Sequence, residues 1–324
     1  MSTLWTLAQM PSQVGKRIFI TGGNSGVGYY AAVELARCGA VVVLACRDRT
    51  RGEEALRQLK RDAVGPESAA DRAELVILNL ASLDSVRRVA EDEVAHRQPL
   101  HGLINNAGVM APARRLETVD GFELQFGTNV LGHFALTCGL MQALELGCGA
   151  AAEDSSRVVT LASIAHKRGR IDFEDLQSAR SYDPMRAYGQ SKLGDLMFAF
   201  ELEHRLRAAM RGVRSVAVHP GVARTNLFKV GSSQGVSRKL EQALQWMIGA
   251  LLNDGPQGAL PTLFAATSNQ AAGAGYYGPQ GFQEMRGGDV GPAKVARQAQ
   301  DLAAQRRLWE VCVALTGMDL TVPV

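Results

Sequence analysis

The chain has 324 residues, of which 46% are hydrophobic and 21% charged, so it can bury a large core and lacks the composition of a disordered protein. Its net charge is only +3, and the basic residues are scattered, which argues against a nucleic-acid partner. The five cysteines form no C-x-x-C pair and the six histidines show no metal-ligand spacing, so we expect a reducing compartment and no metal site.

The first ten residues contain neither a positively charged start nor an apolar stretch long enough for a signal sequence or a membrane span. We therefore expect a cytoplasmic protein without a membrane anchor. Length alone allows two domains, but the pattern of elements predicts a single domain over 1–324. We divide it into a core at 16–225, a substrate lid at 226–256 and a C-terminal packing segment at 257–324.

Apolar and amphipathic stretches alternate from the first apolar run to about residue 219. The run at 40–45 lacks polar alternation, which is typical of a strand covered on both faces. The predicted strands are Lys16–Thr21, 40–45, Glu74–Leu80, His101–Asn105, Arg157–Ser163 and Val213–His219. The predicted helices are Val27–Arg37, Arg51–Arg61, Ser82–Ala95, Thr118–Leu146 (one helix or two joined) and Tyr188–Arg211. This order predicts an α/β fold, a doubly wound parallel sheet of the Rossmann type with helices on both faces and ligands at the carboxyl ends of the strands.

After Thr225 the periodicity weakens. Five apolar residues share one face of a helix predicted at 240–251: Leu240, Leu244, Met247, Ile248 and Leu251. That helix can pack in the core, act as a substrate lid or contact a membrane surface. The remaining predicted elements are a helix at 258–266, a short strand at Gly275–Gly278 and a helix at Ala293–Leu315.

Three glycines follow the first predicted strand, at Gly22, Gly26 and Gly28. Glycine lets a backbone turn sharply and approach a pyrophosphate, and a helix that begins at Val27 offers unpaired N–H groups to the phosphates. Glycine at such a junction can also be purely structural. We interpret the loop, with Asn24 and Ser25, as a candidate dinucleotide site.

Arg47 follows the second predicted strand. In dinucleotide-binding folds an acidic residue at this place binds the ribose of NAD, whereas an arginine accommodates the 2′-phosphate of NADP. The alternative is a surface arginine paired with Asp48. Given the loop upstream, we expect NADP(H) rather than NAD(H).

Tyr188 and Lys192 are four residues apart on a predicted helix, so their side chains share one face and the ammonium group can stabilise a phenolate. Alone, this spacing is usually an ordinary exposed pair. Ser163, at the end of the fifth predicted strand, changes that balance. Its hydroxyl can hold a substrate oxygen while Tyr188 transfers a proton.

These motifs resemble those of the short-chain dehydrogenase/reductase family, in the same order and spacing. The resemblance runs from about Gly15 to Thr225 and is carried by Thr21–Gly28, Asn105–Gly108 and Tyr188–Lys192. It implies that Asn129 is a fourth catalytic residue, which anchors a proton-relay water. It also implies that Tyr188 and Lys192 contact the cofactor, with Lys192 on the nicotinamide ribose. The further implied cofactor contacts are Asn79 and Leu80 for the adenine, Asn106, Ala107 and Gly108 along the cofactor, and Pro220, Gly221, Val222 and Thr225 for the nicotinamide amide.

Two segments, Ala45–Asp48 and Ala162–His166, and the long interval between Ser163 and Tyr188 look like the branch of retinol dehydrogenases and WW-domain oxidoreductases. The resemblance therefore implies hydride transfer between NADP(H) and a small-molecule carbonyl or alcohol, such as a ketone, an aldehyde, a retinoid or a steroid, with Tyr188 as acid/base. Two alternatives stay open, a catalytically silent NADP-binding sensor and a pigment reductase similar to protochlorophyllide reductase. The sequence also leaves a homo-oligomer open.

Overall fold

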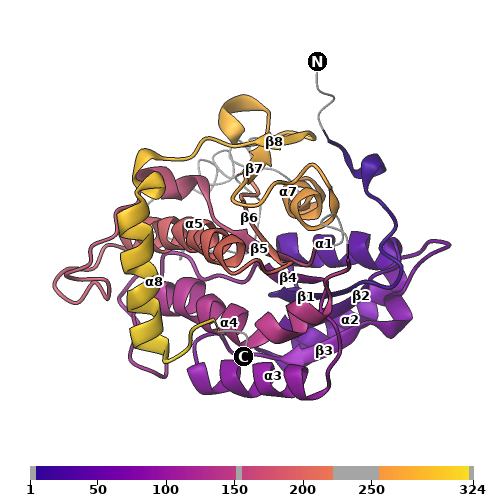
Figure 1. The fold of residues 1–324 in the computed structure, drawn as a ribbon, viewed down its shortest axis with the longest axis horizontal. Coiled ribbons are helices and arrows are strands. Elements are labelled where there is room, and N and C mark those ends of the chain that lie inside the picture. The colour runs from indigo at the N-terminus through magenta and orange to yellow at the C-terminus, as the bar shows by residue number, and fades with distance from the viewer. Residues whose placement is uncertain (1–4, 151–154, 222–254, 321–324) are drawn as a thin grey trace, which may run out of the picture.

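The structure is a computed structural model that describes residues 5–150, 155–221 and 255–320 (Figure 1). Its centre is an eight-stranded sheet in the order β3-β2-β1-β4-β5-β6-β7-β8. The strands are β1 Arg17–Thr21, β2 Val41–Cys46, β3 Glu74–Ile77, β4 Gly102–Asn105, β5 Arg157–Leu161, β6 Arg214–Val218, β7 Tyr276–Pro279 and β8 Val290–Pro292. Neighbouring strands from β3 to β7 pair in parallel, and β8 pairs antiparallel with β7.

The predicted doubly wound α/β sheet is thus confirmed, with an antiparallel edge strand that was not predicted. The chain starts at β1 and builds outward to β3, then returns to place β4 on the other side of β1. In open sheets of this kind, ligands bind at that reversal point, beyond the carboxyl ends of the strands. The ends of β1 and β4 therefore mark where a site is expected.

Helices cover both faces of the sheet (Figure 1). The longer ones are α1 Gly26–Arg37, α2 Arg49–Asp62, α3 Leu83–Ala95, α4 Gly132–Leu146, α5 Pro184–Ala208, α7 Gly255–Thr267 and α8 Leu302–Thr316. A π-helix, η3 (Phe126–Leu131), runs directly into α4. None of the described helices combines the length and the apolar character that a membrane crossing needs.

Two hydrophobic cores lie on opposite faces of the sheet. Along β1, Ile18 and Ile20 belong to the core with α1 and α7, whereas Phe19 between them belongs to the core with α3, α4, α5 and α8. Successive strand residues point to opposite faces, so an unbroken apolar strand is required wherever both faces are buried. Full burial of one such side chain stabilises the fold by roughly 1.5–3 kcal/mol.

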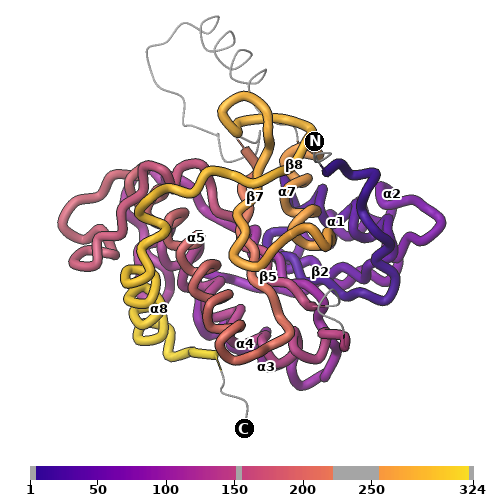
Figure 2. Tube along the Cα trace, turned by 45° about the horizontal axis from the view of Figure 1, so that its top comes forward, coloured from indigo at the N-terminus to yellow at the C-terminus, as the bar shows by residue number. Residues whose placement is uncertain are grey.

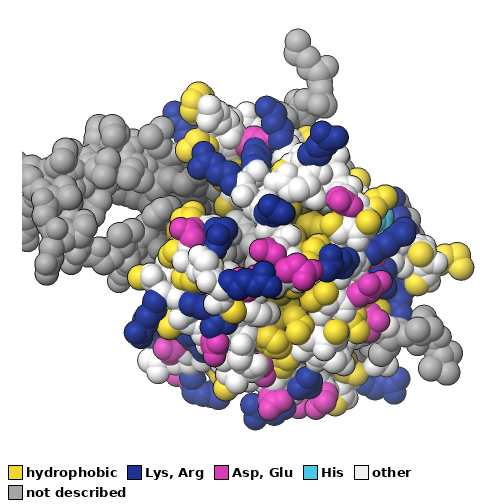
Figure 3. Space-filling model, turned by 90° about the vertical axis from the view of Figure 1, so that its left-hand side faces the viewer, with side chains coloured by type: hydrophobic (Ala, Val, Ile, Leu, Met, Phe, Trp, Pro, Cys, Tyr) yellow, Lys and Arg dark blue, Asp and Glu magenta, His cyan; other side chains and the backbone are white. Residues whose placement is uncertain are grey.

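The segment from β8 to α8 is the main departure from the predicted elements. It crosses over alongside α5 as an extended chain with the short 3₁₀ helix η8, Arg297–Gln300 (Figure 2). The helix predicted from residue 293 begins only at Leu302, because the Asp301 carboxylate accepts the N–H groups of Ala303 and Ala304 and caps α8 there. On the face that carries α8, basic and acidic side chains are interspersed (Figure 3).

The prediction of a helix from Thr118 to Leu146 is wrong in its first part. Thr118 accepts a backbone hydrogen bond from Gly121, whose φ of 83° belongs to the left-handed region, so this stretch is a turn. The helical stretch starts after Glu123, a fully buried residue whose carboxylate accepts the N–H groups of Gln125 and Phe126. The buried carboxylate therefore sets the helix start.

Two smaller boundaries also differ. β3 ends at Ile77 rather than at Leu80, so Asn79 and Leu80 lie in the turn beyond the strand. α5 begins at Pro184, one turn before the predicted start, because Asp183 accepts the N–H of Arg186 as its N-cap. The helix predicted at 240–251 lies outside the described residues.

Candidate active site

The glycine-rich loop joins β1 to α1 and is packed tightly against the segment that follows β4. Gly22 and Gly26 have φ values of 65° and 57°, which glycine adopts without strain. A Cβ on Gly28 would lie 2.3 Å from Nδ2 of Asn106 and 2.8 Å from the carbonyl oxygen of Gly22. A side chain at position 28 would therefore force the two segments apart.

Thr21, the last residue of β1, ties the loop to the segment after β4. Its hydroxyl oxygen accepts the N–H groups of Asn106 and Ala107 at 2.9 and 3.0 Å. In return, the Asn106 side-chain amide donates to the carbonyl oxygen of Thr21 at 2.8 Å. Asn106, Ala107 and the exposed Gly108 thus lie beside the loop at the reversal point of the sheet.

The first turn of α1 suits a phosphate group. Ser25 is the N-cap residue, but its side chain makes no capping hydrogen bond, whereas Asp48, Ser82 and Asp183 cap α2, α3 and α5. Asn24 and Ser25 are half-buried and exposed, while Val27 packs inward. The first N–H groups of α1 therefore receive no capping hydrogen bond from the Ser25 side chain. A helix N-terminus of this kind can bind a phosphate group.

Arg47 stands exposed just beyond the carboxyl end of β2. The Asp48 carboxylate accepts the N–H of Arg51 and lies 3.8 Å from the Arg51 guanidinium group. Within the described part of the chain no salt bridge joins Arg47 to Asp48, so the alternative interpretation of Arg47 as half of that pair finds no support.

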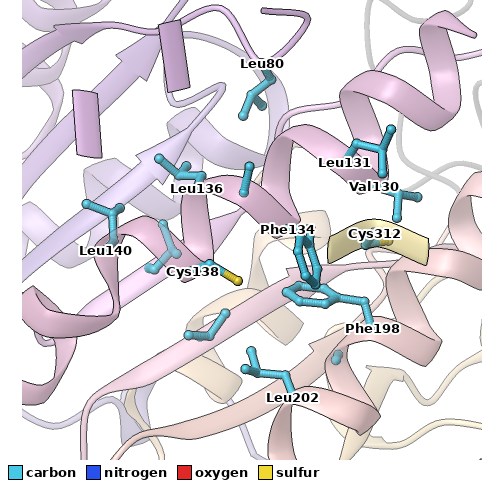
Figure 4. Close-up of a cluster of buried hydrophobic side chains, with 14 of the residues drawn as sticks. Leu80, Val130, Leu131, Phe134, Leu136, Cys138, Leu140, Phe198, Leu202 and Cys312 are labelled. Atoms are coloured by element: carbon cyan, nitrogen blue, oxygen red, sulfur yellow. The ribbon is translucent and has the colours of Figure 1, made fainter. Parts of the chain in front are cut away.

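The two residues assigned to the adenine differ in their surroundings. Asn79 is half-buried, and its Oδ1 accepts the N–H of Ala81 at 3.1 Å. The second lone pair of that oxygen can accept another hydrogen bond. The Leu80 side chain is 6% exposed and belongs to the hydrophobic core that includes residues of η3 and α4 (Figure 4). Any contact of Leu80 with a cofactor would therefore be made by its backbone.

Ser163 and Tyr188 are both half-buried, whereas Lys192 between α5 and the sheet is buried. The Lys192 ammonium donates to the carbonyl oxygen of Leu161 at 2.8 Å and to Oδ2 of Asp195 at 2.8 Å. Leu161 ends β5, two residues before Ser163. The bond from Lys192 to Leu161 therefore attaches the turn of α5 that carries Tyr188 and Lys192 to the strand end that carries Ser163.

Asn129 lies in the π-helix and is fully buried. Its side-chain amide binds both backbone polar groups of Val109: Oδ1 accepts the Val109 N–H at 2.9 Å, and Nδ2 donates to the Val109 carbonyl oxygen at 3.0 Å. The same amide donates to the Ser191 hydroxyl at 3.0 Å, which in turn donates to the backbone oxygen of Tyr188 at 2.9 Å. Asn129 thus joins the segment after β4 to the turn of α5 that carries Tyr188.

His133 is a residue of this network that the motif analysis missed. Its Nδ1 must carry the proton because it faces the carbonyl oxygen of Asn129 at 2.8 Å, so Nε2 accepts the hydroxyl proton of Thr21 at 2.9 Å. Burial lowers the pKa of His133 to about 3, which keeps the imidazole neutral. Its spacing of four residues from Asn129 on a helix was the available clue.

His166 was missed for a different reason, because its partners come from the distant C-terminal segment. Nδ1 of His166 donates to the carbonyl oxygen of Ser163 at 2.6 Å, while Nε2 accepts the N–H of Ala296 at 3.2 Å. The Gln298 side chain donates to the carbonyl oxygens of His166, Lys167 and Gly169. The segment after β8 therefore braces the turn that follows Ser163.

Pro220 and Gly221 follow β6 at the same edge of the sheet. Gly221 has a φ of 73°, and its N–H donates to Nδ1 of the buried His219 at 3.2 Å. Val222 and Thr225, the other two residues assigned to the nicotinamide amide, lie outside the described residues, as does 226–254 of the predicted lid.

Comparisons with known proteins agree with this architecture. The family model for short chain dehydrogenases matches residues 16–234. Mouse polyprenol dehydrogenase is 38% identical over 308 residues, which cover 95% of this chain and 86% of that protein. Mouse retinol dehydrogenase 13 is 38% identical over 312 residues, which cover 94% of this chain and 85% of that protein.

Solved structures with a similar fold also point to this family. The crystal structure of an uncharacterised protein from Mycobacterium paratuberculosis has a TM-score of 0.77 and 38% sequence identity, and the match covers 98% of this chain and all of that one. The complex of Pseudomonas aeruginosa RhlG with NADP, at 22% identity and a TM-score of 0.61 over 82% of this chain and 94% of that one, shares the fold. The chain therefore belongs to the short-chain dehydrogenase family of oxidoreductases and resembles its retinol dehydrogenase branch.

Proposed function

We propose that the protein is an NADP(H)-dependent oxidoreductase that interconverts an alcohol and its carbonyl compound, with Tyr188 as the acid/base. The observation that carries the proposal is the set of hydrogen bonds that joins the Tyr188 turn to Leu161 through Lys192 and to Asn129 through Ser191. The supporting side chains of Asn129 and Lys192 are buried, while the hydroxyl-bearing Ser163 and Tyr188 are only half-buried. This division suits two reacting hydroxyl groups held by a fixed support.

In the direction of reduction, bound NADPH would supply the hydride to the carbonyl carbon. The Tyr188 hydroxyl donates its proton to the carbonyl oxygen, which becomes the hydroxyl of the product. The Ser163 hydroxyl donates a hydrogen bond to the same oxygen and stabilises the charge that develops there. Lys192 stabilises the phenolate that remains on Tyr188 until solvent returns a proton. In oxidation the same groups act in reverse.

NADP(H) is preferred over NAD(H) in this proposal because Arg47 is exposed beyond the end of β2 and has no salt bridge to its neighbour Asp48 within the described residues. The names of the relatives suggest the substrate class. Polyprenols and retinol are long apolar alcohols, so we assign this enzyme an apolar alcohol or the matching aldehyde or ketone.

The test is a turnover screen with NADPH and NADH against aldehydes, ketones, retinoids, polyprenols and steroids, in the parent and in Tyr188→Phe. We expect turnover with NADPH and a loss of about 100-fold or more in Tyr188→Phe, because a positioned general acid contributes ~10²–10⁴. NADPH binding, followed by fluorescence, should stay close to that of the parent.

Two outcomes would overturn the proposal. If Tyr188→Phe keeps turnover within about tenfold of the parent, the tyrosine is not the acid, since that is below the usual effect of such a group. If the parent binds NADPH tightly but turns over no compound of the panel, a sensor is the better description. Visible absorption from a co-purified pigment would instead favour a pigment reductase.

A further inference from the structure

Asp195 lies beside the active-site lysine in a place that the Tyr188–Lys192 motif does not cover. It follows Lys192 by three residues on α5, so the two side chains share one face of the helix. Its Oδ2 is 2.8 Å from Nζ of Lys192, and the two side chains are only 2% and 7% exposed. An acidic group has thus been placed in direct contact with the charge that the reaction uses.

We propose that Asp195 is a positioning residue that fixes Lys192 and controls how much of its positive charge acts on Tyr188. The inference rests on the proposed function, because it concerns the acid/base of that same site.

The geometry leaves Lys192 little freedom. An ammonium group has three N–H donors, and Leu161 and Asp195 each accept one at 2.8 Å. At most one donor is left for the reaction site. The other carboxylate oxygen, Oδ1 of Asp195, is buried and finds no hydrogen-bond partner within the described residues, so the carboxylate depends on Lys192 for its stabilisation.

Burial and the neighbouring ammonium act on Asp195 in opposite directions. Burial raises the pKa of Asp195 to about 6, although Lys192 opposes the rise. When Asp195 is neutral, Lys192 presents an uncompensated positive charge. When Asp195 is ionised, the two charges largely cancel at any point outside the pair, and the phenolate of Tyr188 is stabilised less.

Besides Tyr188, which is the group to be controlled, two titratable groups from neighbouring helices lie around the pair, and burial keeps both of them uncharged. From α8, Cys312 remains a thiol because burial and Asp195 raise its pKa. From α4, His133 remains neutral because burial, and to a smaller degree Lys192, lowers its pKa to about 3. Asp195 is therefore the group whose charge changes the field of Lys192.

The test substitutes Asp195→Asn, which keeps the shape and an oxygen acceptor for Lys192 but removes the negative charge. Ionisation of Tyr188 is followed without any substrate, as the ultraviolet phenolate absorbance of each protein minus that of the same protein carrying Tyr188→Phe. We expect the midpoint of Tyr188 ionisation to move to lower pH by about one unit. Asp195 follows Tyr188 by seven residues, roughly 10 Å along the helix, and removing one unit charge at that distance shifts an ionisation by about one pH unit at an effective dielectric constant of ~20.

The matched control is Glu201→Gln, a buried carboxylate on the same helix that pairs with Arg205 instead of with Lys192. Its midpoint should equal that of the parent. An equal midpoint in parent and Asp195→Asn would overturn the inference, whereas the turnover screen decides the proposed function separately. Should Asp195→Asn fail to fold, Asp195→Ser is titrated in the same way, with the same expected shift and the same refuting result.

Discussion

The buried imidazole of His133 makes the stability of this protein depend on pH in a way that one substitution can isolate. His133 is 2% exposed and holds its Nδ1 proton on the Asn129 carbonyl oxygen, with Nε2 accepting from Thr21. A second proton on Nε2 would displace the Thr21 hydroxyl proton and place a charge in the core. The folded protein therefore excludes a proton that the unfolded chain accepts.

The size of the effect follows from linkage. Burial lowers the pKa of His133 from 6.5 to about 3, so its contribution to stability is complete above the unfolded value and is lost as the pH falls toward the folded value. At pH 5 the unfolded chain gains about 2 kcal/mol from protonating this one histidine, while the folded protein gains almost nothing. That is a large share of an ordinary stability of ~5–15 kcal/mol.

The assay is urea unfolding at pH 7.5 and at pH 5, on the parent, on His133→Gln and on Phe134→Leu. Other buried groups titrate in all three proteins, so only the difference between the two pH values is compared. We expect that difference to be smaller by about 2 kcal/mol in His133→Gln than in the parent. Phe134→Leu lowers the stability at both pH values by removing buried apolar surface, yet it should keep the parent's difference. Equal differences in His133→Gln and the parent would refute the neutral, buried state of the imidazole.

Two further predictions concern the cofactor. Arg47→Asp should lower the ratio of kcat/KM for NADPH over NADH by about 10- to 150-fold, the equivalent of the ~1.5–3 kcal/mol of charge-assisted hydrogen bonds to a 2′-phosphate, and an unmoved ratio would make Arg47 a simple surface residue. Gly28→Ala should weaken NADPH binding by about tenfold or more, because its Cβ would lie 2.3 Å from the Asn106 amide and overpacking costs ~1–3 kcal/mol; Gly288→Ala, whose Cβ meets nothing within 4 Å, is the control, and equal NADPH affinity in both variants would contradict the packing argument.

The parts of the fold that the sequence predicts are those that local patterns determine. Strands β1, β2, β4, β5 and β6 are short apolar runs flanked by amphipathic stretches, and both features are visible in any window of a few residues. The parallel order then follows from the alternation of strand and helix. The start of α5 is also determined by a local pattern, because Asp183 followed by Pro184 is a usual N-cap and first-turn pair. The predicted helix nevertheless began at the Tyr188 motif, one turn too late.

The parts that could not be predicted depend on partners far along the chain. Strand β8 exists because Val290 to Pro292 pair with β7, and the stretch behind it is held by His166 and Gln298, whose bonds span about 130 residues. A helical propensity over 293–301 cannot compete with these contacts, since propensity differences are only tenths of a kcal/mol per residue. Likewise, the buried Glu123 sets the start of a helix later than predicted, through hydrogen bonds that no periodicity reveals.

The same contrast applies within the candidate active site. Tyr188, Ser163 and Lys192 can be proposed from sequence because each has a chemical role that its residue type suggests. Thr21, His133 and Ser191 have no such role, but they complete a chain of hydrogen bonds from the glycine-rich loop through Asn129 to the backbone of Tyr188. In a buried site each donor or acceptor without a hydrogen-bond partner costs about 1–3 kcal/mol. A network in which every member has a partner, with one tautomer of His133, therefore favours a single arrangement of the loop relative to the tyrosine. A substitution in this hydrogen-bonded network that touches neither cofactor nor substrate should therefore disturb the alignment of the loop and the tyrosine, so its members belong to the candidate site together with the residues proposed to carry the chemistry.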